Sequence, residues 1–507
     1  MKRAAFFLVG GCLLAQGSFA AQPAVTIYNQ NFAVVRDTVP LDLKRGVNQV
    51  RYAGATMHVE PDSVILRDPA GKRTLQILEQ NYRADPISQE LLLSLNEGKT
   101  IEFETFRQVD GQQKREIIQG KIIRSGYVPH TAAFGRYGQQ YAYSQMAYAS
   151  GPGTGQPIIE VDGKLRFSLP GQPLFPSLGD DTILKPTLLW MIQADKAGKF
   201  DAELSYVTGG MMWEADYNLV SPEKGDSLDL VGWVTMDNQS GKTFENARIK
   251  LMAGDVQKLQ PEGYNRFVAR YASSGFGGAM APPVTEKAFD EYHLYTLERP
   301  TTLLDRETKQ VEFVRATGIK SESIYVYDGA KIDPNRYRGW SYDSIRQDRE
   351  YGTQCNPKVW VMREFTNSEP NHLGMPLPKG RLRFYRRDAD GQMEFTGEDT
   401  IDHTPRDETV RVFTGSAFDL VGERKRTNYK MDSTRNWLDE SFEIKLRNRK
   451  KEPVEIRAVE HLYRWTNWEI TEKSNTFLKT DAQTIEFRVQ VNPDEEQTAS
   501  YTVHYSW

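Results

Sequence analysis

Apolar and polar residues alternate along most of the chain. Residues 100–106 (Thr-Ile-Glu-Phe-Glu-Thr-Phe) alternate strictly, which is the pattern of a strand with one buried face. Residues 25–28 begin a strand that we expect to continue through residues 32–35. Short apolar runs separated by frequent turn residues are typical of β-sandwiches. The pattern therefore predicts an all-β protein.

Turn residues predict where neighbouring strands are joined. Aspartate followed by glycine favours tight two-residue hairpin turns, and this pair occurs at Asp162-Gly163 and at Asp390-Gly391 between strand-like runs. Residues 450–453 (Lys-Lys-Glu-Pro) join two further runs, and we expect a hairpin there too. The turns support a β architecture built from antiparallel neighbours.

One short helix is expected in the N-terminal part, near residues 86–97. Asp85 can cap its start, and Pro86 suits the first turn. Residues 87–95 carry an apolar face, and Gly98 can end the helix.

Two segments lack the aliphatic and β-branched residues of a packed core. Residues 126–156 form a Tyr/Gly-rich loop, and residues 269–290 form a Gly/Ala/Pro linker. They divide the chain into a β-domain at residues 21–125, a middle β-sandwich at 157–268 and a C-terminal β-sandwich region at 291–507. The predicted architecture is multi-domain, with immunoglobulin-like sandwiches.

The first twenty residues have the pattern of a secretory signal peptide. Lys2 and Arg3 precede an apolar stretch at residues 4–14, and residues 18–20 (Ser-Phe-Ala) form a small-x-small cleavage site. No later segment approaches the ~20 apolar residues of a membrane helix. We expect a protein exported to the periplasm or cell envelope of a bacterium, without an integral span.

The net charge of the mature chain bears on which partners it can bind. Loss of the signal peptide removes two of the 64 basic residues and leaves 62 against 68 acidic ones, a net charge of −6. A mildly acidic surface argues against nucleic acid as a partner.

Cys355 would be the remaining cysteine after loss of the signal peptide. No intramolecular disulfide can then form, and we expect a small buried thiol.

Motifs for cofactors and metals are not found in the sequence. Two Gly-Lys-Thr triplets, at residues 98–100 and 241–243, lack the preceding glycine of a phosphate-binding loop and are interpreted as turns. The histidines have no metal-ligand spacing. We expect no cofactor and no bound metal.

The densest polar cluster provides the candidate catalytic residues. Glu398, Asp399, Asp402 and His403 could form an acid–base pair or a metal site. Alternating strand geometry sends neighbouring side chains to opposite faces, which favours a structural role at the turn before Pro405. No catalytic residue is therefore assigned, and these four stay the candidates.

Aromatic residues suggest two further interpretations. Trp465 and Trp468 fit corner packing of strands, with a stacking platform for envelope sugars as the alternative. Residues 499–507 alternate towards the terminal Trp507 and could be a buried sandwich strand or a lipid-facing strand of an outer-membrane β-barrel. The irregular, charged strands elsewhere favour the sandwich.

Seven passages of the chain together carry a family resemblance: residues 28–37, 210–217, 238–247, 292–295, 403–405, 459–463 and 501–507. They resemble the family built on domain of unknown function 4139. Its members are mostly exported bacterial proteins, and related proteins are described as mucoidy-inhibitor-like. The resemblance implies no activity and no catalytic residues.

The function expected from the sequence is non-catalytic. We expect binding or scaffolding in the periplasm, with an envelope protein or a glycan as partner. The alternatives are a hydrolase of envelope polymers that uses the cluster at residues 398–403, and an outer-membrane β-barrel.

Overall fold

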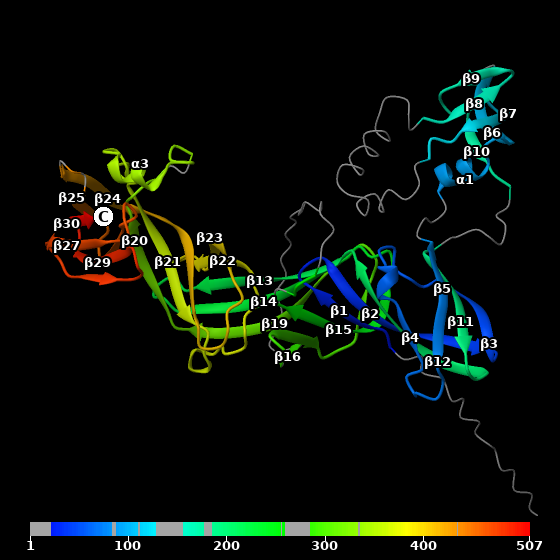
Figure 1. The fold of residues 1–507 in the computed structure, drawn as a ribbon, viewed down its shortest axis with the longest axis horizontal. Coiled ribbons are helices and arrows are strands. Elements are labelled where there is room, and N and C mark those ends of the chain that lie inside the picture. The colour runs from blue at the N-terminus through cyan, green and yellow to red at the C-terminus, as the bar shows by residue number, and fades with distance from the viewer. Residues whose placement is uncertain are drawn as a thin grey trace, which may run out of the picture. The chain divides into compact units, whose positions relative to one another are not determined.

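The computed structural model shows a mostly β protein (Figure 1), as the sequence predicts. It describes residues 22–83, 88–109, 112–127, 156–176, 185–254, 256–258, 284–332, 335–432, 434 and 436–507. Among them, no helix is long and apolar enough to cross a membrane.

The chain forms two compact units, each assembled from separate segments. Unit 1 contains Met1–Trp213, Met236–Met280 and Thr296–Lys309. Unit 2 contains Glu214–Thr235, Ala281–Tyr295 and Gln310–Trp507. The predicted loop at 126–156 and linker at 269–290 lie largely outside the described residues, so these boundaries stay predictions.

The largest sheet of unit 1 has the strand order β15-β1-β2-β12-β4, with β18 paired to β15. Its core includes Val25, Ile27 and Val35. The strands are β1 (Ala24–Tyr28), β2 (Phe32–Leu43), β4 (Ile65–Arg67), β12 (Gly198–Gly209), β15 (Phe244–Ala253) and β18 (Thr301–Leu303).

The expected single strand over residues 25–35 is wrong. β1 and β2 form an antiparallel hairpin in which Tyr28 pairs with Phe32. Asn31 adopts φ 63°, a left-handed conformation that asparagine tolerates better than most residues. The turn residues 29–31 (Asn-Gln-Asn) include no glycine, so the apolar pattern alone predicts one continuous strand.

A second sheet of unit 1 has three strands in the order β3-β11-β5. Trp190 is buried in the central strand, and its indole N–H donates to Gln80 Oε1 of a neighbour at 2.8 Å. The strands are β3 (Gly46–Tyr52), β5 (Leu75–Arg83) and β11 (Thr187–Ala194).

A third sheet of unit 1 has five strands in the order β10-β6-β7-β8-β9. Leu93 of α1 (Gln89–Leu95) shares its small core with Phe103, Ile122 and Ile159. The Asp162-Gly163 hairpin is confirmed, because it joins paired strands with positive φ at both residues. The strands are β6 (Thr100–Val109), β7 (Gln112–Arg124), β8 (Ile158–Val161), β9 (Lys164–Arg166) and β10 (Gln172–Leu174).

The expected helix exists but is shorter than residues 86–97. Ser88 caps it, with its hydroxyl accepting from the Leu91 N–H at 3.2 Å. The expected cap at Asp85 and first turn at Pro86 lie outside the described residues. Gly98 has φ +80° after the helix, as a terminating glycine should.

Another sheet has the order β19-β14-β13-β22-β23. The Asp390-Gly391 turn joins β22 to β23, which pair in register from Gly380 opposite Ile401, so this hairpin is confirmed. The strands are β13 (Met211–Ser221), β14 (Leu228–Asn238), β19 (Glu307–Ile319), β22 (Gly380–Arg387) and β23 (Met393–Ile401). Two further strands, β16 (Val284–Phe289) and β17 (Tyr292–Leu297), pair with each other.

The last sheet, in unit 2, has nine strands in the order β27-β30-β25-β24-β21-β20-β26-β29-β28. A short helix, α3 (Tyr342–Gln347), lies in the connection between β20 and β21 (Figure 1), and the sequence did not predict it. The strands are β20 (Ser321–Asp328), β21 (Lys358–Thr366), β24 (Thr409–Met431), β25 (Trp437–Asn448), β26 (Val454–His461), β27 (Trp468–Lys473), β28 (Phe477–Lys479), β29 (Thr484–Val491) and β30 (Glu496–Ser506).

One core lies between the two halves of this sheet. Side chains of β25 and β30, such as Ile444 and Val503, share it with Ile456 of β26 and Phe487 of β29. The expected hairpin at residues 450–453 is therefore wrong. β25 pairs with β24 and β30, and β26 pairs with β20 and β29, so this connection crosses from one half of the sheet to the other.

The structure of unit 2 also tests the expectations for the C-terminal strand and for Cys355. The C-terminal stripe is buried, since Tyr501, Val503 and Tyr505 are at most 3% exposed within the same core. Cys355 is exposed, so the expectation of a buried thiol is wrong. The residue follows α3 in an irregular connection, where apolar periodicity gives no information on burial.

Candidate functional site

The structure separates the carboxylates of the predicted polar cluster. Glu398 and Asp399 are consecutive residues of β23, which places their side chains on opposite faces. Glu398 pairs across the sheet with Arg383, at 3.7 Å between Arg383 Nε and Glu398 Oε2. Asp399 accepts from the backbone N–H of Phe413 at 2.7 Å. These contacts are structural links between strands.

Asp402 and His403 follow the strand and have different surroundings. The Asp402 side chain is 87% exposed, and its Oδ1 lies 3.3 Å from Lys379 Nζ. His403 accepts the backbone N–H of Lys379 on Nδ1 at 3.1 Å. The imidazole therefore helps to hold the turn beside the Leu377–Thr404 bridge. No group of three or more potential metal ligands occurs among the described residues.

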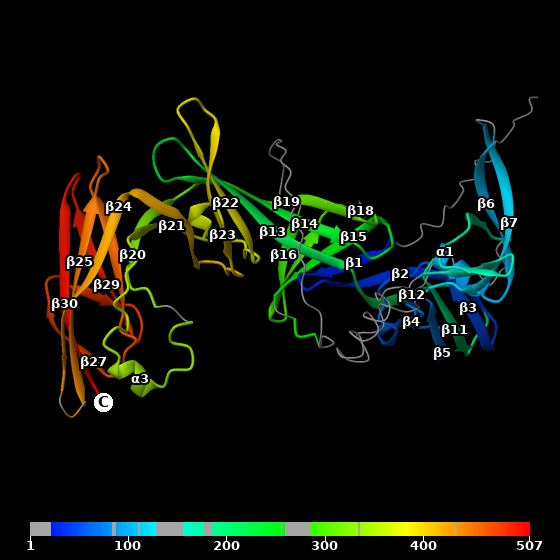
Figure 2. The ribbon, with the colours of Figure 1, turned by 90° about the horizontal axis from the view of Figure 1, so that it is seen from above.

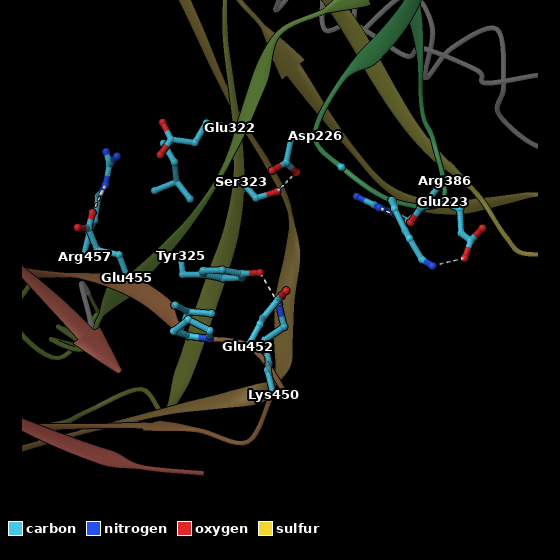
Figure 3. Close-up of a pocket in the computed structure, with 15 residues that line it drawn as sticks. Glu223, Asp226, Glu322, Ser323, Tyr325, Arg386, Lys450, Glu452, Glu455 and Arg457 are labelled. Carbon is cyan, nitrogen blue, oxygen red and sulfur yellow. Dashed lines mark hydrogen bonds and ion pairs between the residues drawn. The ribbon is translucent and has the colours of Figure 1, made fainter. Parts of the chain in front are cut away.

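Unit 2 also contains an open pocket of about 650 Å³ (Figure 3). It is lined by the start of β20, the turn at residues 223–226 and the connection at residues 450–457. Figure 3 shows Tyr325 in its wall, with Lys450 and Glu452 beside the ring. Lys450 Nζ donates to the Tyr325 hydroxyl at 2.7 Å.

The charges of this pocket largely neutralise one another. Lys450 Nζ lies 2.6 Å from Glu452, and Arg363 Nη1 lies 2.6 Å from Asp226. Burial lowers the pKa of Lys450, but hydrogen bonds to Glu452 and Tyr325 outweigh burial and raise it, so the ammonium stays charged. A charged ligand would have to replace these pairs.

A buried ion-pair network lies at the other end of strands β20 and β26. Arg464 and Glu440 form a bidentate pair, with both side chains at most 3% exposed. Arg426 contributes a second guanidinium, at 3.1 Å from Glu440 Oε1. Such a pair is strong only when its remaining N–H groups also find acceptors.

Those N–H groups bind the backbone of the segment that contains α3. Arg464 donates to the carbonyls of Ile345, Asp348 and Tyr351 at 2.8–3.1 Å. Arg426 also donates to the carbonyl of Arg349. The ends of the connection between β20 and β21 are joined by the Ala330–Cys355 bridge, and buried charges hold its middle.

A second buried pair holds the same segment. Arg424 Nε lies 2.8 Å from Glu460 Oε1, and Tyr501 donates its hydroxyl to Glu460 Oε2 at 2.6 Å. Arg424 Nη1 donates to the carbonyl of Gly352 at 2.6 Å. Burial lowers the pKa of Arg424, but the adjacent carboxylate of Glu460 raises it above its ordinary value. The Arg424 guanidinium therefore stays charged.

The segment held in this way presents aromatic rings to solvent. We call residues 335–352, together with Trp465 and Trp507, the aromatic cap. Tyr342 is 75% exposed and lies edge-on to Trp465, with ring centroids 6.2 Å apart. The guanidinium of Arg346 lies 4.2 Å from the Trp465 ring and 5.3 Å from the Trp507 ring.

Three further rings, those of Tyr337, Trp340 and Tyr351, belong to the aromatic cap. Tyr337 contacts both Trp340 and Tyr351, at centroid distances of 5.1 and 5.0 Å. Trp340 is 42% exposed. Trp, Tyr and Arg are the residues most enriched at the energetic centres of binding surfaces.

Trp465 and Trp507 were singled out from the sequence, whereas the segment at residues 335–352 was not. Trp465 and Trp468 both pack partly against the core of unit 2, as the packing interpretation predicts. Residues 335–352 contain four arginines and four aromatic residues with a single aliphatic one, Ile345. This Arg- and aromatic-rich composition is the feature of the sequence that could have indicated the aromatic cap.

Comparison with protein-family models gives a match over the C-terminal part of the chain. The model of the family named domain of unknown function (DUF4139) matches residues 202–507. This range contains the polar cluster, the pocket and the aromatic cap. No curated protein matches the chain.

Proposed function

This chain belongs to the DUF4139 family, and we propose that it is an exported, non-catalytic binding protein of the bacterial cell envelope. Residues 1–20 support export through their signal-peptide pattern. The divergent contacts of Glu398, Asp399, Asp402 and His403 support a role without acid–base chemistry in that cluster. We further propose that the nine-stranded sheet is a β-sandwich of immunoglobulin type.

The observation that carries this proposal is the attachment of the aromatic cap by buried arginines. Arg464 and Arg424 each combine a buried carboxylate with backbone carbonyls of residues 345–352. A surface that is ordered before binding loses less conformational entropy when its ligand arrives. Because breaking a buried ion pair is costly, these pairs hold the surface above them in one conformation.

The proposed ligand is an oligosaccharide of the cell envelope. Tyr342, Trp340 and Trp465 offer ring faces and edges, and tyrosine and tryptophan combine an apolar body with a polar tip. Arg349 is exposed and adds donors for hydroxyl groups. Sugars present both apolar C–H faces and hydroxyls, so they match this mixture better than a purely apolar partner does.

The test is calorimetric titration of the purified full chain with peptidoglycan fragments and exopolysaccharide oligosaccharides. We expect binding that Tyr342→Ala together with Trp340→Ala weakens about tenfold or more, because each removes an exposed ring. Phe418→Ala is the matched control, since Phe418 is 96% exposed on β24 outside the aromatic cap.

Two results would contradict the proposal. Equal losses for the Phe418→Ala control and for the double variant would remove the aromatic cap as the binding surface. Shortened oligosaccharides after incubation would show catalysis. Cell fractionation tests export separately, and we expect the mature chain in the periplasmic or envelope fraction, without residues 1–20.

A further inference from the structure

The aromatic cap carries more positive charge than its own carboxylates neutralise. Arg336, Arg338 and Arg349 are exposed. Within the part of the chain that the structure describes, none of these three guanidiniums forms an ion pair with a carboxylate. Figure 2 shows α3, which lies in the same segment, beside the C-terminal end of the chain. The whole chain has 68 acidic and 64 basic residues, so this surface differs from the average of the protein.

The carboxylates of residues 335–352 are mostly engaged. Asp343 forms an ion pair with Arg346. Asp348 is half-buried and accepts the backbone N–H of Glu350 at 2.9 Å. The carboxylate of Glu350 is exposed and lies 3.5 Å from the Thr353 hydroxyl. The segment therefore presents three unpaired guanidiniums to solvent against the single exposed carboxylate of Glu350 that lacks an ion pair.

The ion pairs beneath the segment add to this excess. Glu440 is shared by two guanidiniums, those of Arg426 and Arg464. All three side chains are at most 12% exposed, so water and salt screen their charges weakly. Among these three groups one positive charge is left over, and Arg464 binds backbone carbonyls of the segment directly. The field of this charge favours an anion at the surface.

A row of contacting groups links two of the unpaired arginines. Neighbouring members of the row lie 5.0–5.9 Å apart, measured between ring centroids or from a guanidinium carbon to a ring centroid. In order, the members are Arg336, Tyr337, Tyr351, Arg464, Tyr429 and Arg349. An unpaired positive charge therefore lies at each end of a row of aromatic rings.

The cations of residues 335–352 are all arginines, and this stretch contains no lysine. A guanidinium that lies over a ring uses its face, while the N–H donors at its edge stay available. Those donors bind two oxygens of a carboxylate or a phosphate in parallel. Arg336 over Tyr337 and Arg349 over Tyr429 both have this arrangement. They are suited to acidic groups on a ligand.

We propose that the ligand of the aromatic cap is an acidic oligosaccharide, whose sugars carry carboxylate or phosphate groups. This inference rests on the proposed function, since it names the class of oligosaccharide that the same surface binds. The exposed rings of Trp340 and Tyr342 pack against the sugars. The acidic groups pair with Arg336 and Arg349, which lie at different points of the surface. A neutral oligosaccharide would cover these guanidiniums without pairing them, which costs binding free energy.

Calorimetric titration of the full chain with matched pairs of ligands tests the inference. Uronate-containing exopolysaccharide oligosaccharides are used before and after reduction of their carboxyls to alcohols, which removes the charge and keeps the sugar rings. We expect the acidic form to bind about tenfold or more tighter. Added salt should weaken binding of the acidic form and leave the reduced form unchanged. A lipopolysaccharide core oligosaccharide, before and after removal of its phosphates, is the matched pair for phosphate.

Substitution of the two terminal arginines of the row tests their role. Arg336→Gln together with Arg349→Gln should weaken binding of the acidic form about tenfold or more and leave binding of the neutral form unchanged. The backbone carbonyl of Arg349, which accepts from Arg426, is retained in this variant. Arg387→Gln is the matched control, because Arg387 is an exposed arginine of β22 outside the aromatic cap. Circular dichroism checks that each variant is folded.

The outcomes separate this inference from the proposed function. A preference for the acidic member of either pair supports the inference and identifies the acidic group. Equal affinity for both members of both pairs would overturn it and leave the proposed function intact, whereas binding of none would contradict the proposed function itself. Single-stranded DNA bound as tightly as the acidic oligosaccharides would show that charge alone is recognised. Equal losses for Arg387→Gln and for the double variant would remove Arg336 and Arg349 as the binding groups.

Discussion

Arg464 and Glu440 form a bidentate ion pair in the interior of unit 2, with Nε–Oε2 at 2.8 Å and Nη2–Oε1 at 3.0 Å. The two residues are 24 positions apart: Glu440 lies on the buried face of β25, and Arg464 follows β26. The pair links that core to the carbonyls of the aromatic cap. The stability of unit 2 and the order of its exposed surface therefore depend on the same charges.

Loss of Arg464 should be severely destabilising. Arg464→Met removes the main partner of Glu440, and an uncompensated buried charge costs about 3–5 kcal/mol of unfolding free energy. Urea denaturation measures the loss. The control is Arg411→Met, which breaks an ion pair with Glu364 in which Arg411 is 50% exposed and should cost about 0–1 kcal/mol. Similar losses for both variants would contradict the importance of the buried network.

Gly422 should not tolerate a methyl group. A Cβ atom at this position would lie 2.0 Å from the Tyr327 ring, which is itself fully buried. Gly422→Ala should therefore lower the unfolding free energy by about 1–3 kcal/mol through overpacking. Tyr327→Leu in the same chain should recover part of the loss, and a double-mutant cycle measures the coupling. Additive effects would show that the two positions do not clash.

His461 should make stability depend on pH. A hydrogen bond between its Nε2 and Asp328 raises the pKa of His461 above the ordinary 6.5, although burial lowers it, and the carboxylates of Glu460 and Asp481 also raise it. A raised folded-state pKa stabilises the fold fully below pH 6.5, and this contribution is lost as pH rises through the folded value.

Urea denaturation between about pH 6 and 8 checks the pH dependence of His461. Wild type should lose stability as pH rises across this window, and His461→Gln should lose less. Asp328→Asn is the matched change on the other partner and should flatten the profile in the same way. A slope that is identical in all three proteins would exclude the pair as its source.

Cys355 should react in the native protein. Its thiol is exposed, and it is the one cysteine after residue 20. Labelling with a thiol reagent should reach one equivalent without denaturant, at a rate close to that in urea. Cys355→Ser should abolish labelling of the mature chain. Protection in the native protein would agree with the buried thiol expected from the sequence.

The polar cluster should divide into structural and surface positions. Asp399→Ala removes the acceptor of the exposed hydrogen bond from the Phe413 N–H and should cost about 0.5–1.5 kcal/mol. Asp402→Ala changes a side chain that is 87% exposed and should stay within about 0.5 kcal/mol of wild type. Thermal denaturation compares the two. Equal effects would contradict the assigned contacts.

Local features of the fold could be predicted because short segments encode them. Asp162 and Gly163 form a hairpin turn with positive φ at both residues, which follows from their backbone preferences. The alternation at residues 100–106 became β6 for the same reason. The helix was found from its apolar face, although Ser88 rather than a residue further upstream caps it.

The candidate site could not be predicted in the same way. Glu398 and Asp399 are adjacent in sequence, and the period of a strand separates them. Arg346, Trp465 and Trp507 are far apart in sequence and meet in the aromatic cap. Trp465 and Trp507 were singled out from the sequence, but nothing near either residue in the chain indicates which distant segment it contacts.

The sequence by itself determined the mostly β class, two of the three expected turns and the position of the first helix, because these depend on residues within a few positions of one another. Only the tertiary structure decided that residues 450–453 cross between two halves of a sheet, and that Arg464 reaches Glu440 and the backbone around α3. Strand pairing and the partners of buried charges are set by contacts between distant segments. Their free energy depends on burial and geometry, which a pattern of neighbouring residues does not contain.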